Sequence, residues 1–227
     1  MTKAGSLSLD QGALRRLLGR LLKAHGPQHW WPHQGHPFEI MIGAVLTQNT
    51  AWTNVEKAID RLRAADALEA GNLLARPAEE VAELIRPSGY FNVKTRRLLN
   101  LCEWYVRAGG FDSLKTLETD RLRSELLSIS GVGPETCDDI LLYAFGRAVF
   151  VVDAYTFRLF ERLGLIGPGH SYESLRAAVE RAMGDDVDGF NELHALIVRH
   201  CNGICRPRPL CEQCDLHRQC EHFLYNR

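Results

Sequence analysis

The sequence predicts an all-α fold, and three features support this class. Apolar residues recur at three- and four-residue spacing throughout, for example in the leucine-rich segment 14–22, and this is the period of a helix with one buried face. No run of alternating apolar and polar residues is convincing enough to predict a strand. Glycine and proline divide the chain into about ten helices that are joined by short loops.

The chain is large enough to form a substantial core. It has 227 residues, of which 45% are apolar, and this size allows one large domain or two small ones. No apolar run approaches the roughly twenty residues of a membrane span, and the N-terminal stretch MTKAGSLSLDQG has no apolar part of signal-peptide type. We therefore expect a soluble cytoplasmic protein that has no membrane partner.

The overall charge does not indicate a polyanionic partner. The net charge is −1 and the pI is about 6.8, so any nucleic acid must be bound by a local surface. Three basic clusters are present: Arg15, Arg16, Arg20 and Lys23; Lys94, Arg96 and Arg97; and Arg199, Arg206, Arg208 and Arg218. Taken alone, the first cluster is typical of a solvated helix face.

Apolar segments in the first half of the chain predict successive helices. They lie at 14–22, 40–46, 84–85 and 98–101. Breakers that contain glycine or proline lie at 26–27, 35–37, 86–89, 109–110, 131–134 and 167–169.

The segment 118–134 predicts a tight helix–hairpin–helix. A helical pattern over 118–129 is followed by Gly131, Val132, Gly133 and Pro134. Pro134 suits the first position of a second helix, and the two glycines allow torsions and close approaches that a Cβ would forbid. Backbone N–H groups at the start of that helix would suit one phosphate oxygen of a nucleic acid. An ordinary turn between helices is the alternative.

Residues 148–153, AVFVVD, are rich enough in β-branched side chains to form a strand. No partner strand is evident, so we interpret them as an extended connection into a helix that begins after Asp153. On the residues alone, Asp153 is expected to be the N-cap of that helix.

The C-terminal cysteines predict a metal site. Five of the seven cysteines lie between Cys201 and Cys220, and in a cytosolic chain such a cluster indicates metal binding rather than disulfides. Cys205, Cys211, Cys214 and Cys220 have the spacing x5-x2-x5. A structural zinc site usually has two close pairs, whereas here one close pair lies between two equal gaps. The pattern therefore favours a 4Fe–4S cluster over zinc.

The remaining cysteines have other expected places. Cys201 is left outside the ligand set, and Cys102 and Cys137 fall in helical patterns, where burial is expected. Arg206 and Arg208 lie in the cysteine loop, so a cluster there could hold a basic strip against phosphates.

The hairpin, the extended segment and the cysteine loop, in this order and at these distances, resemble the helix–hairpin–helix DNA glycosylases of the endonuclease III family. The likeness spans residues 37–220. It implies a six-helix barrel over 36–147 and a second helical lobe made of 1–35 and 148–227, with the iron–sulfur loop at 205–220. It also implies a base-excision repair DNA N-glycosylase that acts as a monomer on double-stranded DNA and flips the damaged base out of the duplex.

The resemblance implies DNA-binding roles for several residues. Gln48 of LTQNT would fill the gap that the extruded base leaves, and Tyr90 of SGYFNVK would be the wedge that enters the opposite side of the duplex. Gly131, Val132 and Gly133 of the hairpin would hold the DNA backbone.

Asp153 and Glu135 are the catalytic candidates that the resemblance implies. Asp153 matches the catalytic aspartate of the family, where a carboxylate stabilises the oxocarbenium-like sugar and orients or deprotonates the attacking water. Glu135 stands where endonuclease III proper has a lysine that attacks the sugar, forms a Schiff base and cuts the strand. A glutamate cannot form this imine, so the chain resembles the subgroup that includes bacterial 3-methyladenine glycosylases.

We therefore expect a monofunctional enzyme that leaves an abasic site. Two carboxylates near one pocket would raise the pKa of one of them, so Glu135 could hold a proton or contact a cationic base. Alternatively, its charge only stabilises the start of a helix.

The identity of the lesion and the type of activity stay open. Trp52 and Tyr155 could stack on an extruded base, and a cationic alkylated purine would be attracted to aromatic faces and carboxylates, which favours this class over oxidised pyrimidines. A bifunctional glycosylase/AP lyase with another amine is one alternative, and a catalytically inactive lesion-binding protein is another. The segment HWWPH at 29–33 receives no role.

Overall fold

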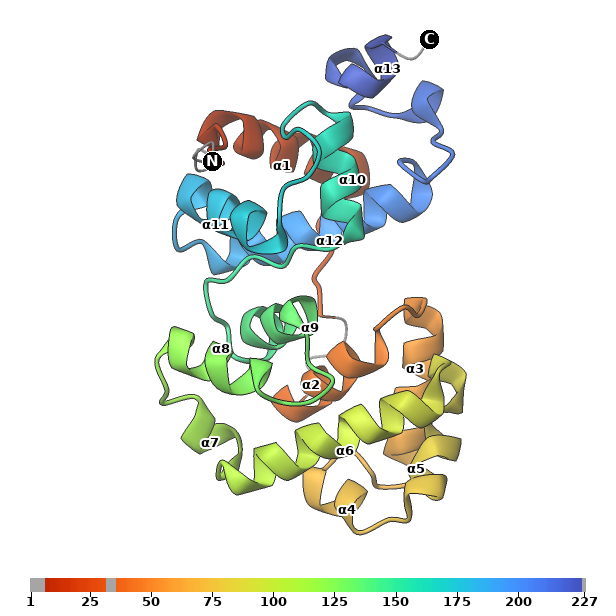
Figure 1. Ribbon diagram of the computed structural model, residues 1–227. Helices are drawn as coiled ribbons and strands as arrows, with labels where there is room; N and C mark the ends of the chain where they lie inside the picture. Colours follow the sequence, from red (N-terminus) through yellow and green to blue (C-terminus); the bar gives the residue numbers. More distant parts are fainter. Residues whose placement is uncertain (1–6, 32–35, 226–227) are drawn as a thin grey trace. The chain divides into compact units, whose positions relative to one another are not determined.

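The computed structural model describes residues 7–31 and 36–225 (Figure 1). Within these residues every regular element is a helix, so the all-α prediction is confirmed. They form thirteen α-helices rather than about ten, because three five-residue helices, α4, α7 and α13, are too short to produce a period in the sequence. None of the helices in the described residues combines the length and apolar character that a bilayer span requires.

The chain divides into two compact units. We call Trp31–Arg147 the central unit, and Met1–Trp30 together with Ala148–Arg227 the terminal unit. The boundary that the sequence predicted between 35 and 36 adjoins residues 32–35, which lie outside the described residues, as do the last two positions of HWWPH.

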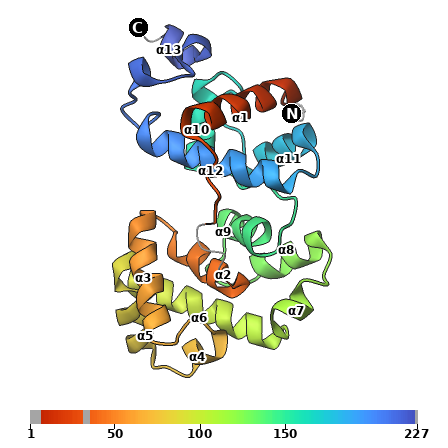
Figure 2. The ribbon, with the colours of Figure 1, turned by 180° about the vertical axis from the view of Figure 1, so that it is seen from behind.

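The central unit is built around two helices, α2 (Pro37–Leu46) and α6 (Phe91–Arg107). Residues 38–46 of α2 are all buried, as expected for a helix that is apolar on every side. The long helix α6 packs against α2, α4 and α5 (Figure 2). The other elements of this unit are α3 (Trp52–Ala64), α4 (Ala70–Leu74), α5 (Ala78–Leu84), η1 (Arg86–Ser88), α7 (Gly110–Leu114), α8 (Thr119–Leu127), α9 (Pro134–Asp139) and the π-helical turn η2 (Ile140–Ala144).

Helices α8 and α9 form the expected helix–hairpin–helix. Pro134 is the first residue of α9, and Gly131 has a φ of 102°. The backbone of Gly131 lies so close to Arg97 that an added Cβ would lie 2.2 Å from Arg97 Cγ. Arg123 of α8 makes two hydrogen bonds of 2.7 and 3.1 Å to the buried carboxylate of Asp138 in α9, and this ion pair joins the two helices.

In the terminal unit, α12 (Val187–Gly203) packs against α1 (Gln11–His25) and α10 (Ala154–Arg162). In Figure 1, α12 runs below both of these helices. The remaining elements are α11 (Tyr172–Met183), η3 (Cys211–Gln213), η4 (His217–Gln219) and α13 (Glu221–Tyr225).

Residues 148–153 are extended and lead into α10, as interpreted from the sequence. Four consecutive side chains at 149–152 are buried, and the N–H of Phe150 donates a hydrogen bond of 3.0 Å to Oε1 of Glu180 in α11. The β-branched composition of this segment therefore reflects burial on both sides rather than membership of a sheet.

The hairpin geometry predicts unequal costs for its two glycines. Gly131→Ala should lower the free energy of unfolding by about 1–3 kcal/mol, because a Cβ is strained at this positive φ and collides with the base of the Arg97 side chain. Gly133→Ala is the matched control, since Gly133 has a φ of −93° and its Cβ would have nothing within 4 Å; it should cost about 1 kcal/mol or less. Urea denaturation measures both, and equal losses would contradict the expectation.

Candidate active site

Asp153 is the N-cap of α10, as predicted, and it is almost fully buried, with 9% of its surface exposed. Its Oδ1 accepts hydrogen bonds from the N–H and the Oγ1 of Thr156, at 2.7 and 2.8 Å. The N–H of Asp153 in turn donates to Thr156 Oγ1 at 3.4 Å, which completes a capping box. One carboxylate oxygen is therefore fixed by the helix N-terminus.

The second carboxylate oxygen faces a histidine. Nε2 of His194, on α12, lies 3.7 Å from Oδ2 of Asp153. Burial by itself would raise the pKa of Asp153, but His194 and the hydrogen bonds from Thr156 outweigh burial and hold this pKa below its ordinary value. Asp153 is therefore a buried carboxylate that keeps its negative charge at neutral pH.

His194 was not identified from the sequence. It lies 41 positions after Asp153, within the apolar stretch LHALIV of an amphipathic helix, where a histidine is usually a packing residue. The signal in the sequence was a histidine among the apolar residues of LHALIV.

Gln48 and the hairpin were predicted as separate DNA-binding features, and the structure brings them together. Nε2 of Gln48 donates hydrogen bonds to the carbonyl oxygen of Gly131 at 3.1 Å and to Oγ1 of Thr136 at 2.9 Å. The Arg97 guanidinium donates to Gln48 Oε1. Val132 of the hairpin is buried, and its N–H donates to the carbonyl of Ile129. The hairpin and the Gln48 loop therefore form one hydrogen-bonded assembly within the central unit.

Tyr90 protrudes from the central unit at the start of α6. Tyr90 is 74% exposed. Its φ of 46° is in the left-handed region, which is rare and costly for a bulky side chain. Such strain in an exposed aromatic residue is typical of functional positions.

Glu135 is exposed in the first turn of α9. It belongs to the central unit, whereas Asp153 belongs to the terminal unit. Its negative charge suits the start of a helix.

The central unit also contains an aromatic pocket of about 370 Å³. The rings of Trp31 and Trp52 meet edge to face, with centroids 4.9 Å apart, and an added Cβ on Gly43 would lie 2.4 Å from the Trp31 ring. The charged residues that line the pocket are Glu39, Glu56, Lys57, Asp60 and Arg63. Trp31 is part of HWWPH, so one residue of that segment contributes to a pocket. Tyr155 lies in the other unit, where the Arg158 guanidinium lies over its ring.

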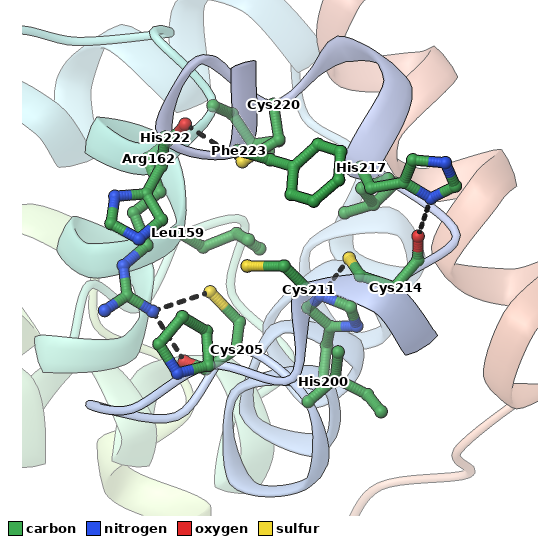
Figure 3. A pocket seen from close by; sticks show the side chains of 14 residues that line it. Leu159, Arg162, His200, Cys205, Cys211, Cys214, His217, Cys220, His222 and Phe223 are labelled. Atoms are coloured by element: carbon green, nitrogen blue, oxygen red, sulfur yellow. Dashed lines mark hydrogen bonds between the residues drawn. The ribbon is translucent and has the colours of Figure 1, made fainter. Parts of the chain in front are cut away.

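The four predicted cysteine ligands line a single pocket in the terminal unit. Figure 3 shows Cys205, Cys211, Cys214 and Cys220 around it. None of them forms a disulfide. The fifth cysteine, Cys201, is not among the lining residues, and its Sγ lies 3.6 Å from the carbonyl oxygen of Tyr155.

Three of these sulfurs have polar neighbours. Arg162 donates to Cys205 Sγ at 3.3 Å, Cys220 Sγ lies 3.2 Å from the Arg162 carbonyl oxygen, and His200 Nε2 lies 3.6 Å from Cys214 Sγ. A hydrogen bond from Cys201 and the charge of Arg162 lower the pKa of Cys205 to about 6 against the effect of burial. A low pKa favours the thiolate, which is the form that binds metal.

This donor set can be compared with the needs of two metal groups. Soft thiolates bind either zinc or a 4Fe–4S cluster, so four cysteines around one pocket suit both groups. The x5-x2-x5 spacing is the feature that favours the cluster.

Comparisons with known proteins agree with these features. The family model of the HhH-GPD superfamily base excision DNA repair proteins matches residues 42–184. A Methanocaldococcus jannaschii protein that is named as a DNA repair glycosylase is 44% identical over 88% of this chain and 92% of its own length. Endonuclease III of Thermotoga maritima is 30% identical over 82% of this chain and 84% of its own length.

Two solved structures are also similar. The 3-methyladenine DNA glycosylase MagIII of H. pylori, bound to 1,N6-ethenoadenine, has a TM-score of 0.72 at 29% identity and covers 86% of this chain and 98% of its own. An endonuclease III in a non-covalent DNA complex has a TM-score of 0.82 at 24% identity and covers 96% of this chain and 98% of its own. This similarity shows that the two chains share a fold. The family match over more than half of the chain and the identity to these relatives show that the chain belongs to the HhH-GPD superfamily of base excision DNA repair proteins, as a DNA N-glycosylase of endonuclease III type.

Proposed function

We propose that the protein is a monofunctional DNA N-glycosylase that releases an alkylated purine from double-stranded DNA and leaves an abasic site. The observation that carries this proposal is the state of Asp153, a buried carboxylate that stays charged while Thr156 holds one of its oxygens.

Asp153 would act through its other oxygen, Oδ2. When the N-glycosidic bond breaks, positive charge develops on the sugar, and a fixed carboxylate stabilises it without reorganising at that moment. The same oxygen can orient or deprotonate the attacking water. His194, 3.7 Å from Oδ2, helps to hold this oxygen in place.

The absence of an amine at position 135 supports a single activity. An imine with the sugar requires an amine, and Glu135 has none. Lys94 is a poor replacement, because only 1% of it is exposed and its Nζ already makes three hydrogen bonds.

The aromatic pocket supports a preference for cationic bases. Its tryptophan faces can attract a positive charge, and its lining has three carboxylates against two cationic side chains. MagIII, which resembles this chain, is named as a 3-methyladenine glycosylase.

DNA contacts would come from the residues that the family resemblance implies. Tyr90 would be the wedge, Gln48 would fill the gap beside the extruded base, and the backbone of Gly131 and Gly133 would approach a phosphate. We infer that one copy of the chain acts on one damaged duplex.

Cys205, Cys211, Cys214 and Cys220 would hold a 4Fe–4S cluster, which supplies a rigid anchor for the loop when it is bound. The loop also contains Arg206 and Arg208, whose charges suit phosphates. A set of reduced thiols this dense suits the cytoplasm, where cysteines stay reduced.

Asp153→Asn should lower the single-turnover rate of base release by about 10²-fold or more, while binding to a lesion duplex is retained. Asp186→Asn is the matched control, because Asp186 caps α12 by accepting a hydrogen bond from Gly189 N–H at 2.8 Å and has no part in the proposed chemistry. If the Asp153 variant released the base as fast as wild type, Asp153 would be a helix cap only. If wild type itself released no base, a lesion-binding role would replace the proposal.

The lowered pKa of Asp153 predicts a pH dependence of stability. A group whose pKa is depressed on folding stabilises the protein above its unfolded pKa, about 3.9 for aspartate, and this contribution is lost as pH falls through the lower folded pKa. Wild type should therefore exceed Asp153→Asn in unfolding free energy at pH 7, and the difference should shrink as pH falls below about 4. Urea denaturation across this range tests it, and a difference that grows toward low pH would contradict it.

The cysteine loop predicts a coloured protein. Anaerobically purified wild type should absorb in the visible region and contain about four iron atoms per chain. Cys211→Ser should lose most of this absorption, whereas Cys201→Ala should keep it, because Cys201 does not line the pocket. A colourless, zinc-loaded wild type would contradict the 4Fe–4S assignment.

A further inference from the structure

Lys94 is a buried cation whose role the proposed chemistry does not explain. The sequence grouped it with Arg96 and Arg97 as a possible basic surface, but only 1% of Lys94 is exposed, so it cannot contribute to such a surface. Burial and the charge of Arg97 lower its pKa to about 8. A lysine at this depth is costly unless its donors are satisfied.

All three donors of the Lys94 ammonium are used. Nζ donates to the carbonyl oxygen of Leu46 at 2.7 Å, to Oγ1 of Thr50 at 2.6 Å and to the carbonyl oxygen of Ser88 at 2.7 Å. Thr50 Oγ1 in turn donates to the Ser88 carbonyl. An ammonium has three donors and no acceptor, so this arrangement matches its full capacity.

The three acceptors belong to the two segments that carry the proposed DNA-inserting residues. Leu46 is the last residue of α2, and Thr50 follows Gln48 in the loop to α3. Ser88 ends η1, two positions before Tyr90. One side chain therefore ties the Gln48 loop to the Tyr90 turn.

We propose that Lys94 is a positioning residue that sets the separation of the Gln48 loop and the Tyr90 turn, so that both side chains enter a damaged duplex together. The proposal rests on the insertion roles given to these two residues above. Its physical basis is that reactive and inserting groups must be held to a fraction of an ångström, and a misplacement of about 1 Å can cost on the order of 10²-fold in rate.

Lys94→Met leaves an unbranched apolar side chain that is one heavy atom shorter, and it removes all three hydrogen bonds. We expect it to lower the single-turnover rate of base release by about 10²-fold. In a background that already has Gln48→Ala and Tyr90→Ala, the same change should cost less than about 3-fold, because the residues through which it acts are gone.

Arg147→Met is the matched control. Arg147 also donates to backbone carbonyls in the central unit, those of Lys115 and Leu117, at 2.7 and 3.0 Å, but these belong to the loop before α8. Its effect should be the same in both backgrounds. An equal loss from Lys94→Met in both backgrounds would overturn the proposal and leave Lys94 with a purely structural role.

Two further measurements keep the test decisive. If Lys94→Met does not fold, Thr50→Val removes one of the acceptors and should show the same dependence on background with a smaller loss. Fluorescence of 2-aminopurine placed beside the lesion reports duplex opening without base release. If wild type opens the duplex but releases no base, the proposed function fails, and the effect of Lys94→Met in the two backgrounds can still be measured by fluorescence. If Lys94→Met changed the fluorescence equally in both backgrounds, the positioning role would be overturned.

Discussion

The burial of a charge together with its hydrogen-bond partners is the constraint on which this protein depends. Asp153 stays ionised inside the terminal unit because Thr156 donates two hydrogen bonds to Oδ1 and His194 lies beside Oδ2. Without them, burial would favour the neutral acid, which can neither stabilise a cationic sugar nor accept a proton from water. The capping box starts α10, and under the proposed function it would also hold the carboxylate ready for catalysis.

The central unit applies the same physical solution to groups that would handle DNA. Gln48 bonds to the hairpin, Arg123 and Asp138 join α8 to α9, and Lys94 satisfies its three donors on two neighbouring segments. The bond from Lys94 to Ser88 lies two positions before the exposed Tyr90, whose φ of 46° is in the left-handed region. A side chain that enters a duplex must offset the free energy of unstacking and unpairing the bases. A rigid support is therefore a physical requirement. Under the proposed function, the terminal unit would supply a fixed carboxylate and the central unit a fixed set of inserting groups.

Local features of the molecule could be predicted from sequence, whereas long-range ones could not. The glycines at 131 and 133 with Pro134 indicated the hairpin, and Asp153 was recognised as an N-cap, because turn and cap chemistry act over a few residues. The partners of these groups lie far away in sequence: His194 is 41 positions from Asp153, and Gln48 reaches a carbonyl 83 positions away. Lys94 was grouped with surface cations for the same reason, since its acceptors come from turns that only packing brings together. The short helices α4, α7 and α13 have too few residues for a period.

The most direct test of the central claim is the chemical state of the product DNA. An end-labelled duplex that contains a single alkylated purine, such as 1,N6-ethenoadenine, is incubated with the protein, and each sample is analysed with and without hot alkali. The account predicts a labelled fragment only after alkali, because Asp153 releases the base and Glu135 offers no amine to attack the sugar. Strand cleavage without alkali, together with a protein–DNA complex that borohydride traps, would contradict the account.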